Sequence, residues 1–403
     1  MKKIFTIAFA ILAASALQSC KQTPASYSSV EGQEIHFFHL GQSRMHPNSV
    51  VVSVADTCKG FKFEWYEDAS YMGELKKVED DVLCDKLDSG AHSHVFYAAT
   101  PSQYSNKLVI VVSDKAGKAV KQVFDMSAYC DVQAHRGGAG LKPEDTIEAQ
   151  IHAIELGCNT LELDVWLSKD KLPVVSHDSY FHPRYSTRPN GTRVLKNEPK
   201  EYLYTMPYDS IAKYDVGLAK NDKFPDHELI PAKKPLLSEL IDACEKYAKD
   251  KGFDLPRYNI EIKNRQGKGE GELWPEITEN INITLPLLLS KGLGDRLVIQ
   301  CFDTFGLNYM HRNYPEVVLS YLTDKSDPDY EENKARLDFI PDWISPEHVC
   351  VTEEMVKKCH LDGTKIVPWT VDDPEEIQRL INIGCDAVIT NYPDRALAIT
   401  RGK

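Results

Sequence analysis

The stretch 131–165, DVQAHRGGAGLKPEDTIEAQIHAIELGCNTLELDV, contains a strand, a helix and a second strand, and it sets the pattern for the rest of the chain. Apolar residues recur at helical spacing between Asp145, which we expect to cap the helix, and Gly157, which ends it. Further strands, with helices between them, are expected at 258–262, 297–301, 317–321, 366–371 and 387–389. About seven or eight such units in succession predict an α/β fold, a TIM-type (β/α)8 barrel rather than an open sheet.

The residues before this stretch follow a different pattern, of short strands separated by turn residues. Strands are expected at 50–54, 62–66, 94–97, 108–112 and 119–124, and no helical stripe lies between them. This pattern predicts a small all-β, sandwich-like accessory domain over residues 30–130. The barrel then spans residues 131–403 and carries a long polar insertion at about 180–235.

The first thirty residues have the composition of a targeting segment. Two lysines precede an apolar run over residues 4–16, which is too short to span a bilayer. The ending Leu17-Gln18-Ser19-Cys20 looks like a bacterial lipoprotein box, with a signal peptide over residues 1–19 and lipidation at Cys20. The polar residues 20–29 would then form a tether. We expect a lipid-anchored protein of the bacterial cell envelope, on the periplasmic or surface face of a membrane; a plain secretory signal is the alternative.

Composition excludes several classes of protein. The chain has 403 residues, of which 42% are hydrophobic and 27% charged, as in a globular protein with a sizeable core. Its net charge of −13 argues against nucleic acid as a partner. The nine cysteines after Cys20 are scattered and form no Cys-x-x-Cys pair, so neither redox nor cysteine–metal chemistry is indicated. No phosphate-binding glycine motif of a nucleotide enzyme is present.

Charged residues occupy two strands that a barrel would normally make apolar. In the strand 161–165, Glu162 and Asp164 share a face, and Glu261 and Lys263 share a face at the end of the strand 258–262. Unpaired charges there would cost several kcal/mol, so these groups must meet partners. Three inward carboxylates and a lysine suit a hard divalent cation, Ca²⁺ or Mg²⁺, but an internal salt-bridge network explains them equally well.

Two histidines lie where barrel active sites are found. His135 follows the first strand, and His177 follows the short strand 173–176. If the intervening turn pairs Ser168 with Pro173, Asp164 lies opposite His177. The two histidines therefore form a candidate acid–base pair. Arg136 should lower the pKa of His135, and the carboxylates should raise that of His177.

At this point the sequence resembles the glycerophosphodiester phosphodiesterase family. The matching segments run in the family's order from about residue 131 to 401: His135-Arg136-Gly137, Pro143-Glu144-Asp145-Thr146, Glu162-Leu163-Asp164-Val165, His177-Asp178, Glu261-Ile262-Lys263, Trp369-Thr370-Val371-Asp372 and Thr390-Asn391-Tyr392-Pro393.

The resemblance implies a metal-dependent hydrolase that converts glycerophosphodiesters to sn-glycerol 3-phosphate and an alcohol. One divalent cation, Ca²⁺ or Mg²⁺, would be held by Glu162, Asp164 and Glu261. His135 and His177 would be acid and base, Arg136 and Lys263 would bind the phosphate, and Glu144 and Trp369 would support the site.

The sequence departs from the family pattern at two positions. Asp145 stands where the family usually has Asn, which we interpret as one helix-capping residue exchanged for another. Cys301 stands where Ser is common, so one contact on the phosphate side should differ. The insertion at about 180–235 is variable in the family, and the head group of the substrate is therefore not implied.

Two other functions fit the same chain. A lysophospholipid or phosphoinositide phosphodiesterase could use the same barrel, and a membrane tether would bring it to its substrate. A binding protein with an inert barrel is the third possibility. The complete set of inward charged residues argues against an inert barrel.

Overall fold

The structure is a computed structural model that describes residues 26–30, 33–39, 50–67, 70–78, 94–99, 107–125 and 130–400. The chain divides into two compact units, with the boundary between Tyr129 and Cys130. The expected signal peptide and Cys20 lie outside the described residues, whereas residues 26–29 of the expected tether are part of a strand. Within the described ranges, no helix has the length and apolar composition needed to cross a bilayer.

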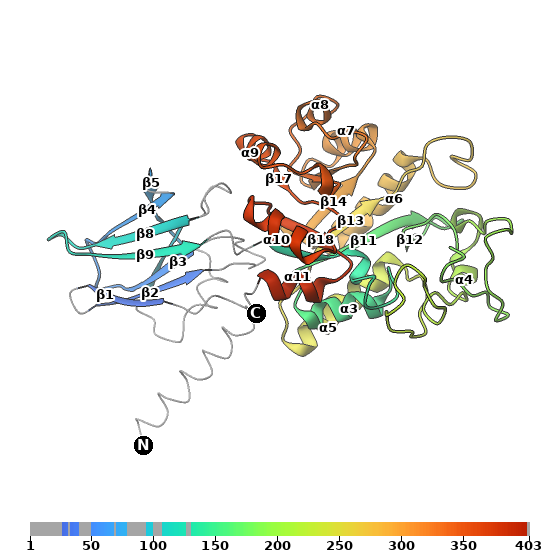
Figure 1. The fold of residues 1–403 in the computed structure, drawn as a ribbon, viewed down its shortest axis with the longest axis horizontal. Coiled ribbons are helices and arrows are strands. Elements are labelled where there is room, and N and C mark those ends of the chain that lie inside the picture. Colours follow the sequence, from blue (N-terminus) through green and yellow to red (C-terminus); the bar gives the residue numbers. More distant parts are fainter. Residues whose placement is uncertain are drawn as a thin grey trace, which may run out of the picture. The chain divides into compact units, whose positions relative to one another are not determined.

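The N-terminal unit is all-β, as predicted. One antiparallel sheet has the order β1-β2-β3-β7-β6. The other has the order β5-β4-β8-β9, and its strands are labelled in Figure 1. The first contains Ser26–Val30, Gln33–His39, Val50–Ala55, His94–Ala99 and Lys76–Lys77; the second contains Ser70–Glu74, Lys62–Glu67, Lys107–Ser113 and Ala119–Asp125. Apolar side chains from both sheets, such as Phe37 and Ile110, form one buried cluster, so the sheets pack face to face.

The C-terminal unit is the predicted (β/α)8 barrel. Eight parallel strands follow the order β17-β16-β15-β14-β13-β11-β10-β18. Their bounds are Asp131–Ala134 (β10), Thr160–Leu167 (β11), Arg257–Ile262 (β13), Leu297–Cys301 (β14), Val318–Thr323 (β15), Trp343–Pro346 (β16), Lys365–Ile366 (β17) and Ala387–Thr390 (β18). Backbone hydrogen bonds from Asp386 to Ile366 (3.1 Å) and from Val371 to Ile389 (2.8 Å) join the last two strands and close the barrel.

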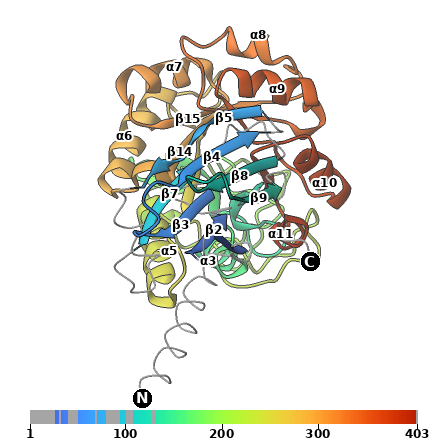
Figure 2. The same cartoon turned by 90° about the vertical axis from the view of Figure 1, so that its left-hand side faces the viewer.

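Helices surround the barrel, as the end-on view shows (Figure 2). They are Ile147–Leu156 (α3), Leu237–Lys251 (α5), Ile277–Ser290 (α6), Thr304–Asn313 (α7), Tyr330–Lys334 (α8), Glu353–Leu361 (α9), Pro374–Asn382 (α10) and Pro393–Thr400 (α11). In α5 the buried residues Leu237, Leu240, Ile241, Cys244 and Ala248 recur at helical spacing, so one face packs against the sheet. The insertion contributes a short helix, Tyr208–Ile211 (α4), and a separate aromatic core that includes Phe181 and Tyr185.

Three expectations about local structure were wrong. Helix α3 is capped by the Thr146 hydroxyl, which accepts from the Ala149 N–H (3.2 Å), and not by Asp145. Strand β16 was not expected, because it is only four residues long and ends in proline. The hairpin between β11 and β12 (Pro173–Val175) pairs Leu167 with Pro173, so Asp164 faces Ser176 and not His177.

Candidate active site

A tight turn at the end of β10 places His135 and Arg136. Residues His135–Gly137 form a 3₁₀ turn in which Arg136 has a left-handed backbone (φ 51°). A Cβ on Gly137 would lie 2.7 Å from Cβ of Ala149, so only glycine allows α3 to begin this close to the turn. The Arg136 N–H donates to Oε2 of Glu162 (2.8 Å), which ties the turn to β11.

The His135 imidazole is buried and held in one orientation. Its Nδ1 lies 2.6 Å from Oδ1 of Asn391. Nδ2 of Asn391 donates to Asp372 (2.8 Å), so the amide oxygen faces the ring and Nδ1 carries the proton. Nε2 is then the basic nitrogen. Burial, together with the neighbouring Arg136 charge, lowers the pKa of His135 well below its usual value, as expected.

Arg136 lies among carboxylates at the base of the site. Its guanidinium is 3.0 Å from Glu144 and 3.3 Å from Asp164, and all three side chains are almost fully buried. Burial alone would raise the pKa of Glu144, but the charges of Arg136, His177 and Lys234 together outweigh it and lower this pKa. For Asp164, the charges of Lys263, His177 and Arg136 likewise outweigh burial and lower the pKa. Glu144 and Asp164 are therefore ionised partners of a buried cation.

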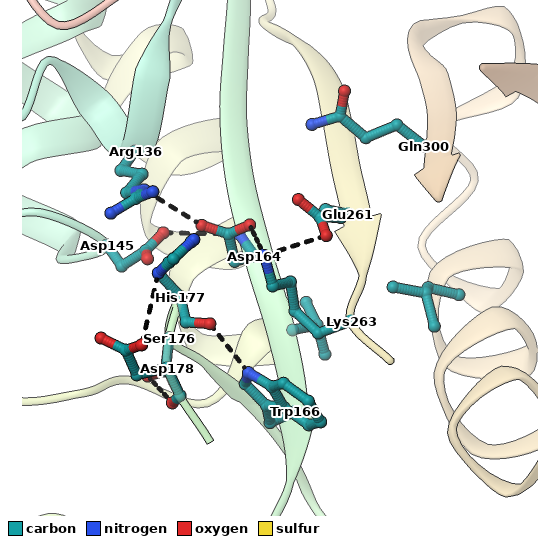
Figure 3. A network of polar contacts seen from close by, with 12 residues as sticks. Arg136, Asp145, Asp164, Trp166, Ser176, His177, Asp178, Glu261, Lys263 and Gln300 are labelled. Atoms are coloured by element: carbon teal, nitrogen blue, oxygen red, sulfur yellow. Dashed lines mark hydrogen bonds and ion pairs between the residues drawn. The ribbon is translucent and has the colours of Figure 1, made fainter. Parts of the chain in front are cut away.

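Strand β13 brings the second cation to the same place. Asp164 and Glu261 are register partners on β11 and β13. The Lys263 ammonium lies 2.9 Å from Glu261 and 3.5 Å from Asp164, between the two carboxylates (Figure 3). Burial raises the pKa of Glu261 to about 7, even though Lys263 acts in the opposite direction. Burial, followed by the Asp164 charge, also raises the pKa of Glu162. The positive charges of Arg136 and Lys263 therefore do not offset the effect of burial on Glu162 and Glu261.

The segment after β12 presents His177. The Trp166 indole donates to the His177 carbonyl (3.0 Å), and Nδ1 of His177 lies 3.6 Å from Asp178 (Figure 3). Buried Lys234, from the end of the insertion, donates to Oγ of Ser176 (2.7 Å), which in turn donates to the Asp178 carbonyl (2.7 Å). Burial and the Lys263 charge lower the pKa of His177, so the expectation that neighbouring carboxylates would raise it was wrong.

These groups meet in one cavity of about 210 Å³ at the carboxyl ends of the barrel strands. Of the expected site residues, His135, Arg136, Glu162, His177, Glu261, Lys263 and Trp369 line it. Asp164 and Glu144 lie behind its wall, paired with Arg136. The lining is completed by Lys223, Gln300, Phe302, Leu322, Thr370 and Ile389.

The two departures from the family pattern are buried and lie outside this lining. Asp145 accepts from the Asp164 N–H (3.4 Å), and burial and the Asp164 charge raise its pKa. It is not an exchanged cap, because Thr146 caps the helix. Cys301 donates to the Ile262 carbonyl (3.4 Å) and accepts from the Asp303 N–H (3.3 Å), so its thiol is engaged within the barrel wall. The Cys301 thiol is not part of a disulfide.

Sequence reasoning assigned no role to three residues that shape the site, although Asn391 belongs to one of the matching segments. Gln300 donates to Oε1 of Glu162 (2.7 Å), and a polar residue inside the apolar strand Leu297–Cys301 was an available signal. Asn391 fixes His135 and directly follows β18, at the end of the barrel where sites form. Lys223 belongs to the insertion, and no local pattern distinguishes it from the other lysines there.

The described residues contain no group of three or more His, Cys, Asp or Glu side chains close enough together to hold a metal ion. Asp164 is turned toward Arg136 and Lys263, whereas Glu162 and Glu261 face the cavity. Oxygen donors with raised pKa values still suit a hard divalent cation, because such a cation would supply the missing positive charge. The donor chemistry fits a metal; the expected three-carboxylate cluster is not formed.

Comparison with known proteins places this barrel among the phosphoric diester hydrolases. Residues 135–395 match the glycerophosphoryl diester phosphodiesterase family, and the chain belongs to this family. A glycerophosphodiester phosphodiesterase of Caldanaerobacter subterraneus subsp. tengcongensis is 28% identical over 270 residues, which cover 67% of this chain and 97% of the relative. The N-terminal unit lies outside the family match.

Two solved structures share the barrel. A Silicibacter pomeroyi protein assigned to the glycerophosphoryl diester phosphodiesterases matches with a TM-score of 0.60 and 27% identity, covering 67% of this chain and 93% of its own. An Oleispira antarctica phosphodiesterase, solved in complex with the product sn-glycerol-3-phosphate, has a TM-score of 0.53 and 23% identity over 67% of this chain and 96% of its own. The second likeness supports the fold alone.

Proposed function

We propose that this chain hydrolyses glycerophosphodiesters to sn-glycerol 3-phosphate and an alcohol. The observation that carries the proposal is the placement of His135, His177, Arg136 and Lys263 on one cavity at the carboxyl end of the barrel. Family membership and the relative named glycerophosphodiester phosphodiesterase support the substrate class.

His135 has the properties of the general base. Its Nδ1 proton is held by Asn391, which leaves Nε2 to accept a proton from the attacking oxygen. Its lowered pKa keeps the ring neutral, and therefore competent as a base, at neutral pH. Arg136 beside it disfavours the imidazolium until the negative charge of a phosphate enters the cavity.

His177 has the properties of the general acid. Burial and the Lys263 charge lower the pKa of His177, whereas the Asp178 carboxylate, 3.6 Å from Nδ1, acts in the opposite direction and favours the charged ring. The charged ring can donate its proton to the departing alkoxide. Burial would raise the pKa of Asp178, but the contact with His177, together with the Lys234 charge, lowers it to about 2. Lys234 and Ser176 hold the backbone of this segment. The acid thus has a carboxylate partner, whereas the base has an amide partner.

A divalent cation, Ca²⁺ or Mg²⁺, completes the proposed site. Glu162 and Glu261 would hold it, with Asp164 as the third carboxylate of the set, and when bound it would neutralise charge on the phosphoryl oxygens. Gln300 and the Arg136 N–H each donate to one oxygen of Glu162, so its carboxylate is already oriented. The protein would be anchored in the bacterial cell envelope through a lipid on Cys20, as the sequence of residues 1–20 indicates.

The test is to measure phosphate-ester products from a substrate panel, with and without a chelator. We expect sn-glycerol 3-phosphate from glycerophosphocholine and glycerophosphoglycerol, and loss of the activity in excess EDTA. Turnover of lysophosphatidylcholine or of a phosphoinositide, but not of the water-soluble diesters, would support the lipid phosphodiesterase instead. If the protein hydrolyses none of these diesters, the result would support a binding protein with an inert barrel.

A further inference from the structure

The two cations expected to bind the phosphate are already paired within the protein. Arg136 lies 3.0 Å from Glu144 and 3.3 Å from Asp164, and Lys263 lies 2.9 Å from Glu261 and 3.5 Å from Asp164. A guanidinium or ammonium held by two carboxylates has much of its charge already neutralised locally. An anionic substrate would be attracted more strongly by a cation of the same cavity that has no carboxylate partner.

Lys223 is such a cation. It comes from the insertion and lines the same cavity as His135, Arg136 and Lys263. Its ammonium lies 5.1 Å from the centre of the Phe224 ring, and among the described residues it forms no ion pair or hydrogen bond. Much of the side chain is exposed, so a ligand entering from solvent can reach it.

The backbone of Lys223 is fixed over the site. Its N–H donates to the side chain of buried Asn221 (3.0 Å), and the Phe224 N–H donates to the Asn221 carbonyl (3.1 Å). The neighbouring Phe224 is buried and meets Tyr392 edge-on, with ring centres 6.3 Å apart. Tyr392 directly follows Asn391, the partner of His135. The turn of the insertion that carries Lys223 is thus packed against the loop that orients the proposed base.

The electrostatic environment is unfavourable for a lysine unless an anion is present. Partial burial, followed by the nearby Arg136 charge, lowers the pKa of Lys223. Glu144 and Asp372 raise this pKa, but their effects are smaller. Two cations held near each other without a shared carboxylate repel. An anion bound between them would reverse this effect, as in sites that recognise phosphate with several basic groups.

We infer that Lys223 binds the phosphate group of the substrate and of the phosphomonoester product, an inference that rests on the proposed function. The insertion would then supply a third phosphate-binding cation from outside the barrel strands. Because the phosphate is common to all glycerophosphodiesters, Lys223 should contribute equally whatever the head group.

The experiment compares Lys223→Gln, Lys223→Arg and Lys220→Gln in the full-length protein in detergent. Lys220→Gln is the matched control, because Lys220 is an exposed lysine of the same insertion that does not line the cavity. Binding of sn-glycerol 3-phosphate is measured by calorimetry. Loss of a hydrogen bond to a charged group predicts binding weaker by about tenfold or more in Lys223→Gln. Binding should stay within about threefold of wild type in Lys223→Arg, which keeps the charge, and unchanged in Lys220→Gln.

The kinetic arm measures kcat/KM on glycerophosphoglycerol, glycerophosphocholine and glycerophosphoinositol 4-phosphate. A fall by a similar factor on all three in Lys223→Gln supports the inference, and a fall confined to the acidic head group overturns it. Unchanged binding and unchanged kcat/KM also overturn it, while leaving the proposed function intact. If the wild type binds sn-glycerol 3-phosphate but hydrolyses no diester, the proposed function fails, and weaker binding by Lys223→Gln still supports the phosphate contact.

Discussion

His135 and His177 differ in the groups that hold their imidazoles, and this difference predicts different responses to mutation. Asn391 holds His135 and Asp178 holds His177. Changing either histidine to Ala should lower kcat by about 10²–10⁴-fold. An activated nitrophenyl ester needs no proton on its leaving group, so it should restore turnover in His177→Ala but not in His135→Ala.

Two controls make this prediction specific. His182→Ala should change kcat little, because His182 lies in the insertion and does not line the cavity. The double variant should lose much less than the product of the single losses, because residues that act as a unit are not additive. Restoration of His135→Ala by the activated ester would reverse the two assignments. Near-normal turnover in either single variant would exclude that histidine from the reaction.

The burial of His135 also predicts how folding stability depends on pH. Its folded pKa lies well below its unfolded value of about 6.5, so below pH 6.5 the unfolded chain binds a proton that the folded chain does not. This histidine therefore destabilises the fold progressively as pH falls below about 6.5, by up to about 1.4 kcal/mol per pH unit. Glu261, with its pKa raised to about 7, acts in the opposite direction. Only a comparison between variants isolates the histidine.

The measurement is urea unfolding of wild type and His135→Gln at pH 7.5 and pH 5.5. Glutamine cannot be protonated, so the variant lacks the acid-dependent loss. We expect the stability difference between wild type and variant to shift in favour of the variant at pH 5.5, by about 1 kcal/mol. An equal difference at both pH values would mean that His135 titrates normally in the folded protein.

At the scale of elements, two helices begin with the same cap but differ in their distance from the chemistry. Thr146 caps α3 and Thr352 caps α9, and each hydroxyl accepts from the N–H three residues on. Replacement of either by Ala should cost about 0.5–2 kcal/mol of stability. Only Thr146→Ala should also lower kcat, because Thr146 follows Glu144 and Asp145 in the segment packed beneath Arg136.

Thr352→Ala is the matched control, because it should lower the stability of the protein without moving any residue of the site. Thermal unfolding and kcat on glycerophosphocholine would be measured for both variants at a temperature where each is folded. An equal fall of kcat in both would show that activity follows general stability. No fall in either would mean that the segment 143–146 keeps its position without the cap.

The same elements show how far the sequence could predict the structure. The barrel was predictable, because strand–helix units repeat and charged residues alternate on β11 and β13. The β11–β12 register was predicted one residue out, because the turn Ser168–Leu172 has a left-handed Lys171 that sequence does not reveal. The pKa direction of His177 was also missed, since it depends on burial and on Lys263, which comes from a different strand. Asn391 and Lys223 are distant from His135 in the sequence, and they come close to it only when the barrel closes.

At the scale of the whole molecule, metal binding should change stability as well as activity. A ligand that binds only the folded state stabilises it by mass action, by about 2.7 kcal/mol at one hundred times its dissociation constant. We expect Ca²⁺ or Mg²⁺ to raise the Tm of the wild type, and excess EDTA to abolish turnover. Glu162→Gln should show neither a Tm response nor turnover, because it removes one carboxylate charge with little change in shape.

Asn333→Asp is the control for this experiment, since it adds a carboxylate at a buried amide that is not part of the cavity lining. It should leave the response of Tm to the metal ion intact, whatever it does to the starting Tm. A full response in Glu162→Gln, or full turnover of the wild type in EDTA, would contradict the proposed metal site and favour a purely ionic network of Arg136, Lys263 and their carboxylates.

The anchor is a property of the whole chain that should be separable from catalysis. The residues that line the cavity all lie between His135 and Ile389, in the barrel unit, more than a hundred residues after Cys20. We therefore expect Cys20→Ser to move the protein from the membrane fraction to the soluble fraction and to leave kcat on glycerophosphocholine unchanged. Cys58→Ser, at a buried cysteine of the β-domain, keeps the lipidation position and should remain in the membrane fraction. Retention of Cys20→Ser in the membrane would exclude a lipid on this residue as the anchor. A soluble Cys20→Ser protein with a much lower kcat on this water-soluble substrate would mean that attachment to the membrane takes part in forming the site.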